Sequence, residues 1–156
     1  MFLKMTVAGL RMDPSTDAPM VVLKDESGMI ALPIWIGASE AHAIAVQLEQ
    51  IRLTRPLTHD LAATILGTLG AELLRVEIHD LKDNTFYASL ILRRGGENFQ
   101  IDSRPSDAIA LALRAGAGIF VARKVLDFAQ PASLDRDPWG RVIENLPDAV
   151  YGKWKH

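Results

Sequence analysis

The order of extended and helical segments repeats within this chain. Residues 19–50 align without gaps to residues 86–117 at a constant offset of 67 positions. Seven of the thirty-two aligned positions are identical, and they concentrate at a turn and at the start of a helical pattern. Because self-similarity at a fixed offset is the mark of an internal repeat, we predict two related β-β-β-α units that share one core.

The hydrophobic period changes within each half. Alternating apolar residues from Ile30 to Ile36 indicate a strand with one buried face, and Pro33, which has no N–H to donate, places that strand at an edge or a bulge. Apolar residues at helical spacing predict helices over 39–51, from 58 to about 70, from 105 to about 116, and over 124–129. Extended segments are predicted at 2–10, 20–23, 29–36, 71–81, 85–92, 97–102 and 119–121. These patterns predict an α+β fold of mixed or antiparallel sheets packed with helices.

The length of 156 residues is close to that of one domain. We assign the domain to residues 1–130 and a peripheral tail to residues 131–156, where Asp, Pro, Arg and Lys increase and no steady period remains. No apolar stretch is long enough to span a bilayer and no secretion signal is visible, so we expect a cytoplasmic protein without a membrane anchor.

Composition excludes several chemistries. The chain has no cysteine, which rules out disulfides, thiolate zinc sites and cysteine nucleophiles. A net charge of −2 is incompatible with coating nucleic acid by bulk positive charge, so any such contact must be local. No glycine-rich nucleotide loop occurs, and Gly95-Gly96 is typical of a hairpin turn.

Two polar clusters stand at predicted helix N-termini, where free N–H groups and the helix dipole favour an anion such as phosphate. The second cluster, Asp102-Ser103-Arg104-Pro105-Ser106-Asp107, sets an arginine between carboxylates. Arg104 could hold a phosphate through two hydrogen bonds, and Asp102 with Asp107 could bind a hard cation. A structural role stays open, because Ser103 can cap the helix and Pro105 can occupy its first turn.

The first cluster, Arg55-Pro56-Leu57-Thr58-His59-Asp60, has the same two interpretations. Thr58 is expected to cap the helix, and Asp60 is expected to face the helix dipole. His59 could act as a general base or a metal ligand near neutral pH. Glu40 aligns with Asp107 in the repeat and is a further candidate carboxylate, with helix capping as its alternative role.

These residues, in this order, resemble the bifunctional nuclease domain family. The resemblance covers roughly residues 2–130 and rests on Leu32–Gly37 followed by Glu40-Ala41, on the cluster at 55–60, and on residues 102–112. It implies an α+β domain of bacteria and plants, often a homodimer, with nuclease activity on DNA and RNA. The family's motif positions fall on Arg55, Thr58, His59, Asp60, Asp102, Ser103, Arg104, Ser106 and Asp107.

The mechanism that we infer from this resemblance is metal-assisted hydrolysis of phosphodiester bonds. A Mg²⁺ or Mn²⁺ ion on Asp102, Asp107 and Glu40 would polarise the phosphate and activate water, while His59 moves a proton. Arg104 would stabilise the phosphate charge, with Asp60 as a further member of the catalytic set. Phosphate-binding positions would be Arg55, Thr58, Ser103 and Ser106.

This mechanism requires the two clusters to meet in space. One alternative is a non-catalytic homodimeric module that binds an anionic ligand or a protein partner. Another is an enzyme that acts on a smaller phosphoester.

Overall fold

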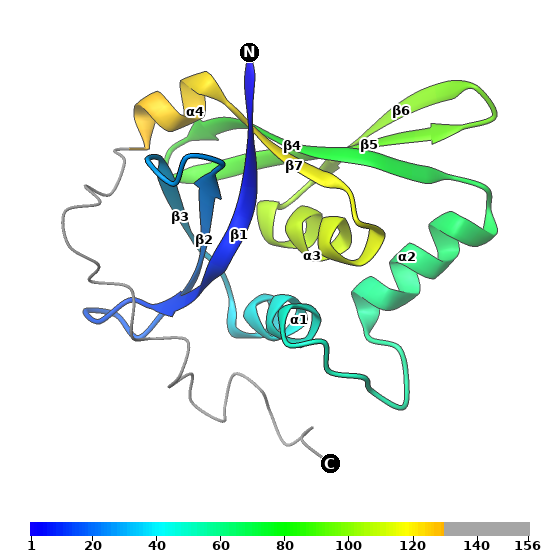
Figure 1. Ribbon diagram of the computed structural model, residues 1–156, viewed down its shortest axis with the longest axis horizontal. Coiled ribbons are helices and arrows are strands. Elements are labelled where there is room, and N and C mark those ends of the chain that lie inside the picture. The colour runs from blue at the N-terminus through cyan, green and yellow to red at the C-terminus, as the bar shows by residue number, and fades with distance from the viewer. Residues whose placement is uncertain (130–156) are drawn as a thin grey trace.

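The computed structural model describes residues 1–129, and the predicted tail at 131–156 lies outside them. The described chain forms one seven-stranded sheet with four helices (Figure 1). The elements are β1 (Phe2–Met12), β2 (Pro19–Asp25), β3 (Ala31–Trp35), α1 (Ala38–Leu48), α2 (Thr58–Thr68), β4 (Glu72–Lys82), β5 (Thr85–Arg94), β6 (Glu97–Ser103), α3 (Pro105–Ala115), β7 (Gly118–Ala122) and α4 (Arg123–Phe128).

The sheet consists of two antiparallel meanders joined by one strand. Its order is β3-β2-β1-β7-β4-β5-β6, and β7 runs antiparallel to β1 and parallel to β4. The fold is therefore α+β with a single mixed sheet rather than several sheets. Each meander is followed by a helix, and the starts of α1 and α3 at Ala38 and Pro105 are 67 positions apart. The two halves thus share an order of elements, and their origin by duplication stays a prediction.

Local predictions are confirmed at two places. Strand β3, which contains Pro33, is an edge strand, where the missing N–H removes no essential ladder bond. Gly95 and Gly96 both have positive φ, 56° and 82°, in the turn between β5 and β6, a conformation that glycine adopts at little steric cost. No helix within residues 1–129 has the length and hydrophobicity to cross a membrane.

The core lies between the sheet and α3. Paired residues Met5, Ile119, Val76 and Leu90 form one buried row across β1, β7, β4 and β5. The alanines of α3 pack in this core, because Ala108, Ala110 and Ala112 are at most 1% exposed. Helices α1, α2 and α3 lie on the same side of the β4–β7 part of the sheet (Figure 1).

Helix α2 has an apolar surface that the sequence pattern alone did not locate. Its period predicted a buried face that included Leu61, Ile65 and Leu69, but these side chains are 51%, 49% and 57% exposed. The side that contacts the core instead uses Ala62, Ala63 and Leu66. The reason is that α2 lies at the margin of the helical layer, so only one side of it meets the core.

Candidate functional site

Strand β6 leads directly into α3 through a fixed turn. Arg104 is the N-cap residue with extended backbone, and Pro105, as predicted, occupies the first turn, where its fixed φ suits the helix. The predicted capping role of Ser103 is wrong: its hydroxyl donates to the Arg104 carbonyl oxygen at 2.9 Å. Ser106 is only 6% exposed, so the start of α3 is held tightly against the core.

The start of α2 is held by a carboxylate. The N-cap residue is Leu57, and its N–H donates to Asp60 Oδ2 at 2.8 Å. Thr58 is therefore the first helical residue and not the predicted cap. Asp60 reaches back over the first turn, which satisfies a backbone donor that the helix leaves unpaired.

The two polar clusters meet between α2 and α3. His59 Nε2 lies 2.8 Å from Asp107 Oδ1, a contact between residues 48 positions apart in the chain. Arg104 donates from Nε to Asp107 Oδ2 at 2.9 Å, and its Nη1 lies 3.1 Å from Glu40 Oε1. These four side chains form one continuous polar network, which we call the His59–Glu40 network.

Glu40 joins this network because the residue before α1 is glycine. The Glu40 carboxylate folds back over Gly37, and a Cβ at that position would collide with it. The N-caps Gly37 and Arg104 are aligned positions of the repeat, as are Glu40 and Asp107. The two aligned carboxylates therefore bind the same guanidinium from opposite sides.

Arg114 is a central residue that the sequence analysis missed. Its side chain is only 5% exposed, and its Nε donates to Asp60 Oδ1 at 2.6 Å. It also donates to the carbonyl oxygens of Ala110, at 2.9 Å, and Ala43, at 3.1 Å, so it ties α1, α2 and α3 together. The sequence did contain a clue to its role. Arg114 follows Asp107 by seven positions, so the two residues must share one face of the helix.

The surroundings of Asp107 and Asp60 favour the ionised form of both carboxyl groups, because each pKa is lowered. Burial acts to raise the pKa of Asp107, but hydrogen bonds from Arg104 and His59, with the charges of both, outweigh burial and lower it. Burial likewise opposes the Arg114 and Leu57 hydrogen bonds at Asp60, whose pKa is also lowered. The Asp107 hydrogen bond and the charges of Asp107 and Glu40 raise the pKa of Arg104.

Acid is therefore expected to destabilise the protein partly through Asp107. A carboxyl whose pKa is lower in the folded state contributes its full stabilisation above its unfolded value, 3.8, and loses it as the pH falls toward the folded value. We expect the melting temperature of Asp107→Asn to fall less steeply with acid than that of the wild type. Thermal unfolding from neutral pH to below 3.8 measures this, and identical slopes for the two proteins would contradict the assignment.

Asp102 lies away from the His59–Glu40 network. Through successive strand pairs, one row across the sheet is formed by Asp102, Ser89, Glu77 and Phe120. This row alternates with the buried row and so faces the side of the sheet opposite α3. Asp102 is exposed, and its side chain makes no hydrogen bond or ion pair with any residue that the structure describes.

The predicted metal ligands are consequently not assembled. The oxygens of Asp107 hold His59 and Arg104, Glu40 Oε1 holds Arg104, and Asp102 faces away from both. Within residues 1–129, no group of three or more His, Asp or Glu side chains is arranged to hold a metal ion. The residues present do not fit the predicted ion in this arrangement, because a cation would have to displace Arg104.

A cavity of about 370 Å³ opens beside Arg104. Arg104, Ser106, Trp35 and Phe86 are among the residues that line it. The Trp35 ring is anchored by a 2.9 Å hydrogen bond from its Nε1 to Asp13 Oδ2. Because the Arg104 side chain is 66% exposed, its guanidinium can meet an anion that enters this cavity. The predicted phosphate contacts Arg55 and Thr58 are exposed, on the loop before α2 and at its first residue.

Comparison with known proteins gives two kinds of relative. Residues 21–133 match the bifunctional nuclease domain. An uncharacterized protein of Mycobacterium tuberculosis is 44% identical over 120 residues, which cover 77% of this chain and 71% of that protein. Bifunctional nuclease 1 of Oryza sativa subsp. japonica is 29% identical over 120 residues, 74% of this chain and 36% of the plant protein. Bifunctional nuclease 1 of Arabidopsis thaliana is 28% identical over 100 residues, 62% of this chain and 31% of that protein.

Proposed function

The chain belongs to the bifunctional nuclease domain family, and from this premise we propose that it hydrolyses phosphodiester bonds in DNA and RNA. The observation that carries the proposal is the contact of His59 with Asp107 next to the exposed guanidinium of Arg104. These groups supply a proton acceptor and a phosphate ligand at one site. The names of the plant relatives support the same chemistry.

The pairing with Asp107 determines which nitrogen of His59 can take a proton. An ionised carboxylate only accepts hydrogen bonds, so His59 Nε2 must be the donor in the 2.8 Å contact. In neutral imidazole the other nitrogen, Nδ1, then carries the lone pair. His59 Nδ1 is thereby set up as a general base.

The proposed reaction uses this base and Arg104. His59 Nδ1 removes a proton from a water molecule, or from the 2′-hydroxyl of RNA, as that oxygen forms its bond to phosphorus. The ester oxygen leaves with the electrons of the broken P–O bond and takes a proton from solvent. The guanidinium of Arg104 neutralises charge on the phosphate, because it can donate two parallel hydrogen bonds to phosphate oxygens.

A cleavage assay with an Arg104→Ala variant tests this proposal. Because a hydrogen bond to a charged group contributes about 1.5–3 kcal/mol, we expect kcat/KM on labelled single-stranded DNA and RNA to fall roughly ten- to a hundredfold. Arg94→Ala is the matched control, since it removes the same charge from the exposed end of β5. Cleavage that both variants retain equally would contradict a role for Arg104.

The same assay, run with a chelator and with added Mg²⁺ or Mn²⁺, examines the predicted metal requirement. That requirement stays a prediction, and Glu40 and Asp107 are the carboxylates that an ion would have to share with Arg104. Cleavage that survives chelation would support the residue-based chemistry described above. Cleavage abolished by chelation and restored by one ion would instead assign a metal to the reaction.

A specific observation also favours the alternative, a non-catalytic homodimeric module that binds an anionic ligand or a protein partner. The carboxylates of the site are already paired with Arg104, His59 and Arg114, as in a structural ion-pair network. The exposed stripe Leu61, Ile65 and Leu69 on α2 is the kind of surface that a partner copy would cover. Oligonucleotide binding without turnover, together with a dimeric mass by light scattering, would support this alternative.

A further inference from the structure

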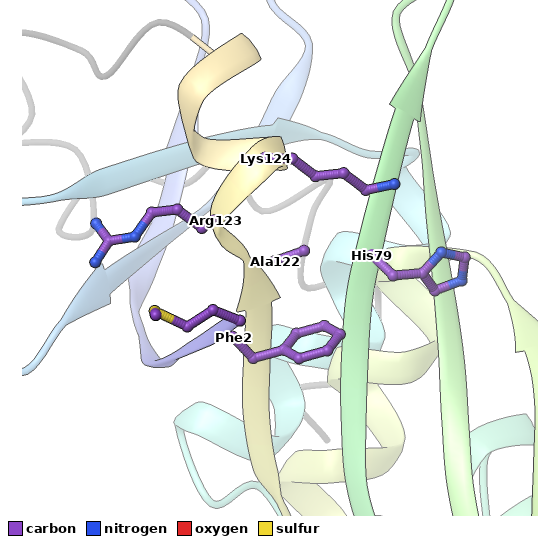
Figure 2. A pocket seen from close by; sticks show the side chains of 6 residues that line it. Phe2, His79, Ala122, Arg123 and Lys124 are labelled. Carbon is purple, nitrogen blue, oxygen red and sulfur yellow. The ribbon is translucent and has the colours of Figure 1, made fainter.

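A second cavity lies on the outer face of the sheet, which we define as the face opposite the one on which α3 packs. Its volume is about 400 Å³, and Phe2, His79, Ala122, Arg123 and Lys124 line it together with Met1. In Figure 2 α4, which carries Arg123 and Lys124, begins next to the cavity, whereas the helices in the pale cyan of α1 and the pale yellow-green of α3 lie behind the strands. The cavity is therefore separated from the His59–Glu40 network by the thickness of the sheet.

The walls of this cavity combine an aromatic ring with cations. Phe2 pairs with Ala122 across β1 and β7, and its ring extends toward β4 (Figure 2). Of the Phe2 residue, 41% is exposed. The Lys124 side chain extends toward β4, as the Phe2 ring does, and lies above His79 in the view, whereas the Arg123 side chain extends in the opposite direction (Figure 2). Aromatic faces next to cations are the common means of binding bases and phosphates of single strands.

Aromatic and basic side chains continue along the outer face. Lys4 follows Phe2 by two residues on β1 and pairs with Phe120 of β7, so all three face the same way. The Phe120 ring fills the space above Gly118, where a Cβ would lie 2.8 Å from the ring. Lys4 and Phe120 thus extend the outer face beyond the cavity, and Glu77, which pairs with Phe120, adds a carboxylate to the same face.

Local charge at the cavity is opposite to that of the whole chain. Asp80 is shared by two lysines, with Lys124 Nζ at 3.5 Å and Lys82 Nζ at 3.2 Å. No carboxylate of the described residues pairs with Arg123. Two of the residues that line the cavity, Arg123 and Lys124, are cationic and none of them is acidic, although the chain carries a net charge of −2. This is the local positive charge that binding of nucleic acid requires.

We propose that this cavity binds a nucleotide unit of single-stranded DNA or RNA, with the base stacked on Phe2 and neighbouring phosphates held by Lys124 and Arg123. A single strand is favoured over a duplex because only unpaired bases expose a face for stacking. The proposal rests on the proposed function for the nature of the strand.

The register of the sheet relates this cavity to Arg104. Val121, Ile78, Ala88 and Ser103 form one row across β7, β4, β5 and β6. Three strand spacings separate the ends of that row, which is about 14 Å. Ala122 follows one end of the row and Arg104 follows the other. One strand of a few nucleotides can therefore contact both, passing around the end of the sheet.

Binding of a short fluorescein-labelled single strand, measured by anisotropy on the full chain, tests the proposal. All proteins carry His59→Ala, so that cleavage of the strand is slowed during the measurement. Loss of two phosphate contacts in Arg123→Ala/Lys124→Ala is expected to raise the dissociation constant about tenfold and to reduce the slope of log K against log salt by about 1.4. Phe2→Ala is expected to weaken binding about fivefold or more, and Phe2→Trp is expected to restore it.

Matched controls separate this cavity from general charge effects. Arg93→Ala/Arg94→Ala removes the same charge at the far end of β5, where Arg93 forms an ion pair with the exposed Glu72, and we expect it to bind like the parent. Equal affinities for the Arg123/Lys124 variant and this control would overturn the proposal, as would a Phe2→Ala protein that binds normally. Failure of the parent to bind any strand would also overturn it.

Further results distinguish this proposal from binding of a free nucleotide and from the proposed nuclease activity. If adenosine monophosphate displaces the strand at concentrations equal to those of unlabelled strand, the cavity holds a free nucleotide and the proposal fails. If the wild type cleaves nothing but binds the strand through Phe2, Arg123 and Lys124, the proposed nuclease activity fails and this inference stands. If the wild type cleaves the strand and the KM of the Arg123/Lys124 variant is unchanged, the proposed nuclease activity stands and this inference fails.

Discussion

Replacement of His59 by alanine is expected to slow cleavage of single-stranded DNA and RNA by about 10²–10⁴-fold, the usual contribution of a positioned general base. The loss should fall on kcat with little change in KM, because the His59 side chain is half-buried at 15% exposure, whereas the charge proposed to bind phosphate is on Arg104, which is 66% exposed. Steady-state kinetics on both substrates measure this. A variant that keeps its kcat would remove His59 from the mechanism.

A double variant shows whether Asp107 acts through His59. Asp107→Asn removes the negative charge and replaces one of the two accepting oxygens with an NH₂ donor, so the side chain can no longer accept from both His59 and Arg104 and kcat should also fall. Residues that act as one unit are not additive. His59→Ala/Asp107→Asn is therefore expected to be about as slow as His59→Ala alone. A large additional loss would mean that Asp107 has a separate role, such as the predicted binding of a metal ion.

Replacement of Arg114 by methionine is expected to reduce the free energy of unfolding by about 3 kcal/mol. Removal of one partner from a buried ion pair costs about 3–5 kcal/mol, and the lower end applies because Asp60 is 36% exposed although Arg114 is only 5% exposed. The loss also leaves the Ala43 carbonyl oxygen without this donor. Denaturation by urea, fitted to a two-state transition, measures the change.

Arg93→Met is the matched control for this stability effect. Arg93 and Glu72 form an ion pair with side chains 52% and 63% exposed, so we expect a loss below about 1 kcal/mol. Asp60→Asn combined with Arg114→Met should recover part of the stability, because it removes the unpaired charge. Equal losses for Arg93→Met and Arg114→Met would show that Arg114 does not join the three helices energetically.

The strands and the starts of the helices could be predicted from the local sequence pattern. The alternation at residues 30–36 and the helical spacing after Pro105 both depend on neighbours a few positions away, and both predicted elements occur. The N-cap residues were harder to predict. Thr58 and Ser103 have capping side chains, yet Leu57 and Arg104 are the N-cap residues. The choice differs by one residue and depends on how Asp60 and Pro105 fit the first turn.

From the residues alone it follows that two polar clusters stand at helix starts and that no cysteine takes part in any site. Which of these polar residues meet depends on the packing of the folded chain. His59 contacts Asp107 across 48 positions, and Arg114 contacts Asp60 across 54, because helices far apart in the chain pack side by side. Asp102 faces the other side because side chains alternate along a strand, so its face depends on the register of β6 with β5. Short-range pattern determines the elements, whereas strand register and helix packing determine the site.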